Sequence, residues 1–112
     1  MPYIYKIYND INEKLYIGKT ETSIQERFSK HLWEAKNKPN LNCAIHNAIN
    51  KYGKEHFYIE QIEECSSDIL SEKEKYWIKY YQTYEDKDKG YNLTPGGDGV
   101  PKYDRDKIFS LW

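Results

Sequence analysis

The sequence has few cysteines, and no pattern pairs them. Cys43 and Cys65 are the only two among 112 residues, and no CxxC occurs. In an intracellular chain, isolated cysteines of this kind are buried thiols more often than a disulfide. A zinc site built from Cys43, His46, His56 and Cys65 has only the Cys-x-x-His spacing at residues 43–46 in its favour, so it is the weaker alternative.

Long apolar runs are also missing. No stretch approaches the roughly 20 apolar residues that a helix needs to cross a bilayer, and residues 1–20 lack the basic and apolar regions of a secretory signal. We therefore expect an intracellular protein without membrane contact.

A strong net charge is the third absence. Seventeen basic and eighteen acidic residues give a net charge of −1, which argues against tight electrostatic binding of nucleic acid by the chain as a whole. Any contact with nucleic acid would have to be local or assisted by another segment. What the chain has in abundance is tyrosine, with 12 residues, too many for one site, so most should be structural.

The first twenty residues indicate a β-hairpin. Apolar and polar side chains alternate over residues 3–8, residues 9–13 form a polar break, and a second short apolar segment follows at residues 15–17. If Tyr5 and Tyr16 face the same side, their phenols lie on neighbouring strands within reach of each other.

A helix is predicted to begin near residue 22. Gly18 would let the backbone turn sharply toward it, and two overlapping capping-box signals start at Thr22 and Ser23. Arg27 and His31 form an i, i+4 pair on a face that neighbours the apolar stripe, where they would project side by side or simply be solvated. The stripe itself consists of Ile24, Phe28, Leu32 and Ala35.

The remaining elements complete one small domain. Helical spacing covers residues 41–52 before Gly53, β-forming residues fill 56–62, and a third helix is predicted to follow a cap at 66–68 and to run to about residue 81. The order predicts an α/β (α+β) sandwich, a small three-stranded mixed or antiparallel sheet flanked by helices.

The domain boundaries follow from composition. We expect a compact domain over residues 1–93 and a Gly/Pro-rich linker over 94–102. Residues 103–112 are either a C-terminal arm that folds back or the start of a further DNA-binding segment.

One carboxylate in the third helix stands out. Glu74 falls on the apolar stripe, whereas Glu72 falls on the opposite side with lysines. A carboxylate that faces the core is costly unless it is paired or binds a cation, so Glu74 is a candidate metal ligand. The alternative is a structural pair with a basic side chain.

Seven ordered residues give the chain a resemblance to the GIY-YIG nuclease family, above all to its phage, viral and intron-encoded homing members. The match extends from residue 3 to residue 92 and includes Lys51-Tyr52-Gly53 and Gly90-Tyr91-Asn92. Tyr3 replaces the glycine of the first motif, and Asn40 stands where some homing members have histidine. The seven residues are Tyr5, Tyr16, Gly18, Arg27, His31, Glu74 and Asn92.

The resemblance implies a metal-dependent DNA endonuclease that hydrolyses phosphodiester bonds. Glu74 would hold one Mg²⁺ or Mn²⁺, and Arg27 would bind the phosphate. Tyr5 would be the general base, with its pKa lowered by Arg27 or Lys19, and His31 would accept or relay a proton.

Further roles are implied for the neighbouring residues. Tyr16 would position the water or the phosphate, and it is nearly as good a candidate for the base. Gly18, Lys19 and Asn92 would contact the substrate. A separate DNA-binding segment or a homodimer would complete DNA recognition. The alternative is a non-catalytic DNA-binding or interaction module of the same fold.

Overall fold

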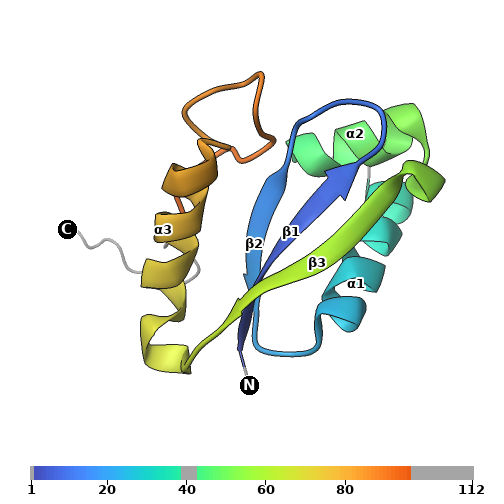
Figure 1. The fold of residues 1–112 in the computed structure, drawn as a ribbon. Coiled ribbons are helices and arrows are strands. Elements are labelled where there is room, and N and C mark those ends of the chain that lie inside the picture. The colour runs from blue at the N-terminus through green and yellow to red at the C-terminus, as the bar shows by residue number, and fades with distance from the viewer. Residues whose placement is uncertain (1, 39–42, 97–112) are drawn as a thin grey trace.

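The computed structural model describes residues 2–38 and 43–96, which fold into a three-stranded antiparallel sheet with helices on both faces (Figure 1). Two short 3₁₀ helices, at Lys54–His56 and Ser67–Ile69, precede β3 and α3. The main elements are β1 (Tyr3–Asn9), β2 (Tyr16–Thr20), α1 (Ile24–Asn37), α2 (Ala44–Tyr52), β3 (Phe57–Glu64) and α3 (Leu70–Tyr81).

The strand order is β2-β1-β3, so the first strand lies in the middle of the sheet. Both pairings are antiparallel, with Tyr5 opposite Gly18 and Ile7 opposite Tyr16 in the β1–β2 pair. The predicted α+β sandwich is confirmed, and its sheet is antiparallel rather than mixed. In Figure 1 the hairpin formed by β1 and β2 lies between the helices of the two outer layers.

Each face of the sheet has its own core. Tyr5 and Ile7 pack with residues of α1 and α2 on one face, and Ile4 packs with Ile17 and residues of α3 on the other. Because β1 is central, its side chains are buried on both faces, and Ile4, Tyr5 and Ile7 are 0 % exposed. This explains why β1 reads as an almost continuous run of large side chains.

The helix termini differ from the sequence prediction at one place. Ser23 and Glu26 form the capping box of α1, as one of the two overlapping signals predicted, and α2 ends at Gly53, where φ is 102°. The predicted cap of α3 at residues 66–68 is wrong. Ser67–Ile69 instead form a 3₁₀ turn, and Ile69 precedes α3 without a side-chain cap.

After α3 the chain returns to the edge of β2. The amide of Leu15 donates to the carbonyl of Lys89 at 3.0 Å, and the amide of Tyr91 donates to the carbonyl of Leu15 at 2.9 Å. These bonds flank a single parallel bridge between Leu15 and Gly90. No helix in the described ranges is both long enough and apolar enough to span a membrane.

Parts of the sequence prediction lie outside the described residues. These are Asn40, most of the expected linker and all of residues 103–112, expected as a C-terminal arm or the start of a further segment.

Candidate active site

Tyr5 is the centre of the candidate site, and Gly18 makes room for it. A side chain at Gly18 would overlap the phenol of Tyr5, which lies directly opposite in the hairpin. Gly18 lies within β2 and is not among the glycines with positive φ, so the expectation that it provides a sharp turn is wrong. Its missing Cβ is used for the close approach of an aromatic ring.

The second tyrosine lies beside the first, as the hairpin predicted. The ring centroids of Tyr5 and Tyr16 are 6.5 Å apart, and that of Tyr16 is 5.4 Å from the His31 ring in an edge-to-face arrangement. Tyr16 lies two residues before Gly18 on β2, so both tyrosines reach the same face of the sheet. The two phenols and the imidazole form one aromatic group.

His31 is not on a solvated face of α1, as the sequence allowed, but is 1 % exposed and points at the sheet. Its Nε2 lies 2.8 Å from the Tyr5 hydroxyl in a buried hydrogen bond. Its Nδ1 lies 3.0 Å from Nε2 of His46 on α2. The imidazole is therefore held at both nitrogens.

Burial keeps both members of the Tyr5–His31 pair neutral. Burial, with the nearby Tyr16, raises the pKa of Tyr5 well above its ordinary value, although the positive charge of Arg27 acts in the opposite direction. Burial, with Arg27 and His46, lowers the pKa of His31 to about 3. Arg27 acts to lower the pKa of Tyr5, as expected, but the expected net lowering is wrong because desolvation outweighs the attraction to Arg27.

Arg27 contributes a guanidinium group with one hydrogen-bonding nitrogen that the described residues leave without a partner. Its Nη1 is buried and has no hydrogen-bond partner among them. The guanidinium is close enough to favour the ionised form of Tyr5 and to disfavour that of His31. A buried guanidinium nitrogen without a partner is costly, which is the situation expected of a group that binds an anionic ligand.

Glu74 approaches from the other face of the sheet. It is buried on α3 with Leu70 and Ile78, while Glu72 is exposed, as the helical periodicity predicted. Lys19 of β2 donates from Nζ to Oε1 of Glu74 at 3.0 Å, so the structural pairing that the sequence left open is also present. Glu74 still acts electrostatically on Tyr5 of the central strand, and its negative charge adds to the rise in the pKa of Tyr5.

Asn92 reaches β2 from the segment that follows α3. Its Nδ2 donates to the carbonyl oxygen of Ile17, and its Oδ1 accepts from the amide of Ile17, both at 2.9 Å. The side chain is buried and behaves like an extra strand residue at the edge of β2. Its contacts are thus with the strand that carries Tyr16 and Lys19.

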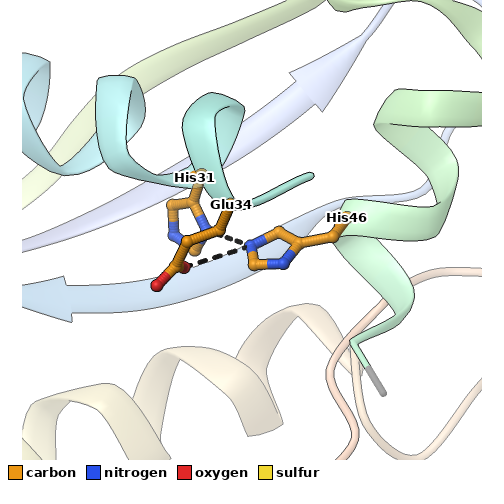
Figure 2. A group of neighbouring side chains, drawn as sticks. All are labelled: His31, Glu34 and His46. Carbon is orange, nitrogen blue, oxygen red and sulfur yellow. Dashed lines mark hydrogen bonds and ion pairs between the residues drawn. The ribbon is translucent and has the colours of Figure 1, made fainter. Parts of the chain in front are cut away.

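Sequence reasoning missed Glu34 in this region, and it named His46 only as part of a different candidate zinc site. Figure 2 shows both beside His31, with the carboxylate of Glu34 3.7 Å from Nε2 of His46. The zinc set of Cys43, His46, His56 and Cys65 does not form. His56 pairs with Asp10 instead, and the one metal-competent group in the described ranges consists of His31, Glu34 and His46. Only tertiary packing of α1 on α2 reveals this group.

Comparison with known proteins identifies the domain. The sequence model of the GIY-YIG catalytic domain matches residues 1–92. The chain belongs to the GIY-YIG family. It carries a GIY-YIG nuclease domain, and the fold agrees with that assignment.

Viral and phage proteins are among the relatives of this GIY-YIG domain. The chain is 34% identical over 82 residues to uncharacterized protein 019R of Invertebrate iridescent virus 6, a match that covers 73% of the chain and 29% of the relative. It is 28% identical over 92 residues to intron-associated endonuclease 1 of Enterobacteria phage T4, covering 80% of the chain and 36% of the relative. The matches thus span about a third of these curated relatives.

Solved structures show the same GIY-YIG fold. The catalytic domain of homing endonuclease I-TevI superposes with a TM-score of 0.70 at 25% identity, covering 84% of this chain and 99% of that domain. A mutant form of the same catalytic domain gives a TM-score of 0.71 at 26% identity, covering 85% and 96%.

Proposed function

We propose that this domain is a metal-dependent DNA endonuclease that hydrolyses phosphodiester bonds. The observation that carries the proposal is the buried hydrogen bond of 2.8 Å between the Tyr5 hydroxyl and His31. Arg27 and Glu74, on helices at opposite faces of the sheet, are both close enough to act electrostatically on Tyr5. Membership of the GIY-YIG family and the likeness to intron-associated endonuclease 1 support the same activity and DNA as the substrate.

Arg27 binds the scissile phosphate in this proposal. Its buried Nη1 lacks a partner among the described residues, and a phosphate oxygen would satisfy it with a charge-assisted hydrogen bond. Such a bond strengthens as negative charge builds up on the phosphate in the transition state, so the guanidinium would contribute to the rate more than to binding.

Glu74 fits a divalent metal ion of the hard, oxygen-binding class. Within the described ranges Glu74 belongs to no group of three or more metal-ligating side chains, and Mg²⁺ often takes one carboxylate together with waters and substrate oxygens. When bound, Mg²⁺ or Mn²⁺ would supply charge stabilisation of the phosphate and of the leaving oxygen. Lys19, which already neutralises Glu74, would be released toward the phosphate.

Tyr5 and His31 act together as the base. Because burial disfavours a free phenolate, the hydroxyl takes the proton of the attacking water while it passes its own proton to Nε2 of His31. The product is a neutral Tyr5 and a positively charged His31, which later returns the proton to solvent or to the leaving group. Tyr16 positions the water through its place beside both rings.

The substrate-contacting roles implied for Gly18, Lys19 and Asn92 divide into direct and indirect ones. Lys19 is the direct contact. Gly18 acts by admitting the ring of Tyr5, and Asn92 acts by fixing the β2 edge at Ile17. Since the matched part is about a third of the curated relatives, we propose that target selection lies in a separate segment or a second copy of the chain.

Plasmid cleavage by purified protein tests the function. Glu74→Ala should abolish cleavage in Mg²⁺, whereas Glu72→Ala, on the exposed side of the same helix, should cleave like the parent. EDTA should abolish cleavage by the parent and by Glu72→Ala. Full activity in EDTA would contradict the metal mechanism. A folded parent that binds DNA without cutting it under any metal condition would establish the non-catalytic alternative.

A further inference from the structure

A second group of metal-ligating side chains lies behind the Tyr5–His31 pair, at the contact of α1 with α2 (Figure 2). His31, His46 and Glu34 each offer one ligand atom to it, and these atoms all lie within 4.8 Å of one another. The atoms that face one another are Nδ1 of His31, Nε2 of His46 and a carboxylate oxygen of Glu34. His31 and His46 are buried, and Glu34 is partly buried, so the group is no chance gathering of exposed acids.

The spacing fits a tetrahedral metal ion. Zinc bonds to imidazole nitrogen and carboxylate oxygen are about 2.0–2.2 Å long, so two ligand atoms at a tetrahedral angle lie about 3.3–3.5 Å apart. The measured separations are 3.0 Å between the two histidine nitrogens and 3.7 Å between His46 and Glu34. These two separations need shifts of only a few tenths of an ångström. The third, between His31 and Glu34, lies within 4.8 Å, and a rotation of the Glu34 carboxylate toward His31 would shorten it.

The outer hydrogen bonds favour ligation as well. The Tyr5 hydroxyl holds Nε2 of His31, and when that nitrogen carries the ring proton, Nδ1 presents its lone pair to the group. Nδ1 of His46 is buried without a partner among the described residues, so a proton there would leave Nε2 free to bind. Ligation therefore requires only that the ring proton between the two facing nitrogens move to Nε2 of His31, with no net loss of protons from the pair.

We propose that His31, Glu34 and His46 form a binding site for a borderline transition-metal ion of the Zn²⁺ class. Two imidazoles and one carboxylate are a usual three-residue zinc set, which leaves a fourth position for water. Mg²⁺ prefers oxygen ligands and is directed to Glu74 instead. The two metal classes thus take separate sites on opposite faces of the sheet.

The site has a consequence for cleavage, which rests on the proposed nuclease function. With Zn²⁺ on Nδ1, His31 must keep its proton on Nε2 and donate it to Tyr5. It can no longer accept the Tyr5 proton, so Zn²⁺ should inhibit cleavage even when Mg²⁺ is saturating. Binding of Zn²⁺ does not depend on the proton transfer or on cleavage, and it is measured without DNA.

The binding test uses the metal-stripped chain in buffer that contains Mg²⁺. Calorimetric titration with ZnCl₂ should give one site per chain, and Co²⁺ in its place should give the intense visible absorption of tetrahedral coordination. His46→Ala and Glu34→Ala should each weaken Zn²⁺ binding by about 100-fold or more, since even loss of an outer hydrogen bond typically costs about 10- to 100-fold.

The controls separate this site from other zinc-binding groups. Cys43→Ser and His56→Ala remove members of the set considered from the sequence and should leave the affinity unchanged. Circular dichroism checks the fold of each variant, and Glu34→Ala, at the half-buried edge, keeps the test valid if His46→Ala does not fold. The hydrogen-bonded histidine pair is purely structural, and the proposal fails, if Zn²⁺ does not bind or binds Glu34→Ala as it binds the parent.

The inhibition test reports on a different claim. Zn²⁺ should slow Mg²⁺-dependent cleavage by the parent and not that by Glu34→Ala, each compared with its own zinc-free rate. Stoichiometric binding without inhibition would keep the metal site and contradict the proton transfer from Tyr5 to His31. A protein that binds Zn²⁺ but never cuts DNA would contradict the proposed function alone.

Discussion

The hydroxyl of Tyr5 and Nε2 of His31 are 2.8 Å apart, although 26 residues separate them in sequence and both are fully buried. Burial opposes phenolate and imidazolium alike, so each group stays neutral in the free protein. Proton transfer between them alone would create an ion pair. In the proposed reaction the attacking water returns a proton to Tyr5 in the same step, so only the positive charge on His31 needs compensation, which the negative phosphate supplies.

The first prediction concerns Tyr5→Phe. The variant should cut DNA at least about 100-fold more slowly, because it removes a proton acceptor that acts in the transition state. It should remain folded, at a cost of about 1–3 kcal/mol for the hydrogen bond lost at His31. Single-turnover cleavage and urea unfolding measure the two effects.

Tyr16→Phe is the matched control on the neighbouring strand. It should lose less activity than Tyr5→Phe, because Tyr16 only positions the water that Tyr5 deprotonates. If Tyr5→Phe cleaves at the parent rate at every pH while Tyr16→Phe does not, the base is Tyr16.

The second prediction is a pH dependence of stability in metal-free protein. The pKa of His31 is about 3 when folded and about 6.5 when unfolded, so above about pH 6.5 the group is neutral in both states. Between these values only the unfolded chain binds the proton. The free energy of unfolding should therefore fall as the pH falls from about 6.5 toward 3, with up to about 1.4 kcal/mol per pH unit from this residue.

Comparison with His31→Gln isolates that contribution. The parent and His31→Gln share all other acid-sensitive groups. The difference between their free energies of unfolding in EDTA should therefore shrink, as the pH is lowered, by the amount that protonation of His31 in the unfolded chain contributes. Curves that run parallel from pH 7 to pH 4 would show that His31 titrates normally in the folded state.

Periodicity and turn chemistry were enough to predict much of this molecule. Alternation at residues 3–8 and 15–17 gave the hairpin that brings Tyr5 beside Tyr16, and the helical stripe placed Glu74 in the core. These are local properties, because a strand or helix imposes its own repeat on the side chains.

What the sequence did not reveal depends on contacts between elements. His31 lies off the apolar stripe of α1 but is buried, since α1 meets both the sheet and α2 over a wide face. Its contact with His46 crosses from one helix to another, and no spacing rule covers that. The prediction of a lowered Tyr5 pKa failed for the same reason, because the burial that raises this pKa depends on how the layers assemble.

The third prediction separates activity from stability at Arg27. Arg27→Met keeps an unbranched side chain but removes the guanidinium, and cleavage should fall by about 100- to 1,000-fold, as for other lost transition-state donors. Because Nη1 is buried without a partner in the described chain, the free energy of unfolding should stay level or rise. Single-turnover kinetics and urea unfolding of the metal-free proteins test this together.

Arg27→Lys completes that comparison. It keeps the charge but not the planar pair of donors, so it should recover only a small part of the rate. A marked loss of stability in Arg27→Met would instead show that the guanidinium is a structural group.

The fourth prediction concerns the ion pair of Lys19 with Glu74. The ammonium lies 3.0 Å from the carboxylate that we propose to bind Mg²⁺, so the two cations compete for the same oxygens. Lys19→Met should therefore bind Mg²⁺ more tightly than the parent, by about tenfold if the competition is worth about 1.4 kcal/mol. Calorimetric titration in the absence of DNA measures the affinity.

Lys6→Met is the matched control, because Lys6 also pairs with a glutamate, at 3.3 Å from Glu60 on the neighbouring strand β3, and Glu60 is not a proposed metal ligand. It should leave Mg²⁺ affinity unchanged. The Lys19 variant should nevertheless cut DNA more slowly, since Lys19 is proposed to move to the phosphate once the ion is bound. Weaker Mg²⁺ binding by Lys19→Met would mean that the lysine holds Glu74 in place for the metal, and the competition argument would then be wrong.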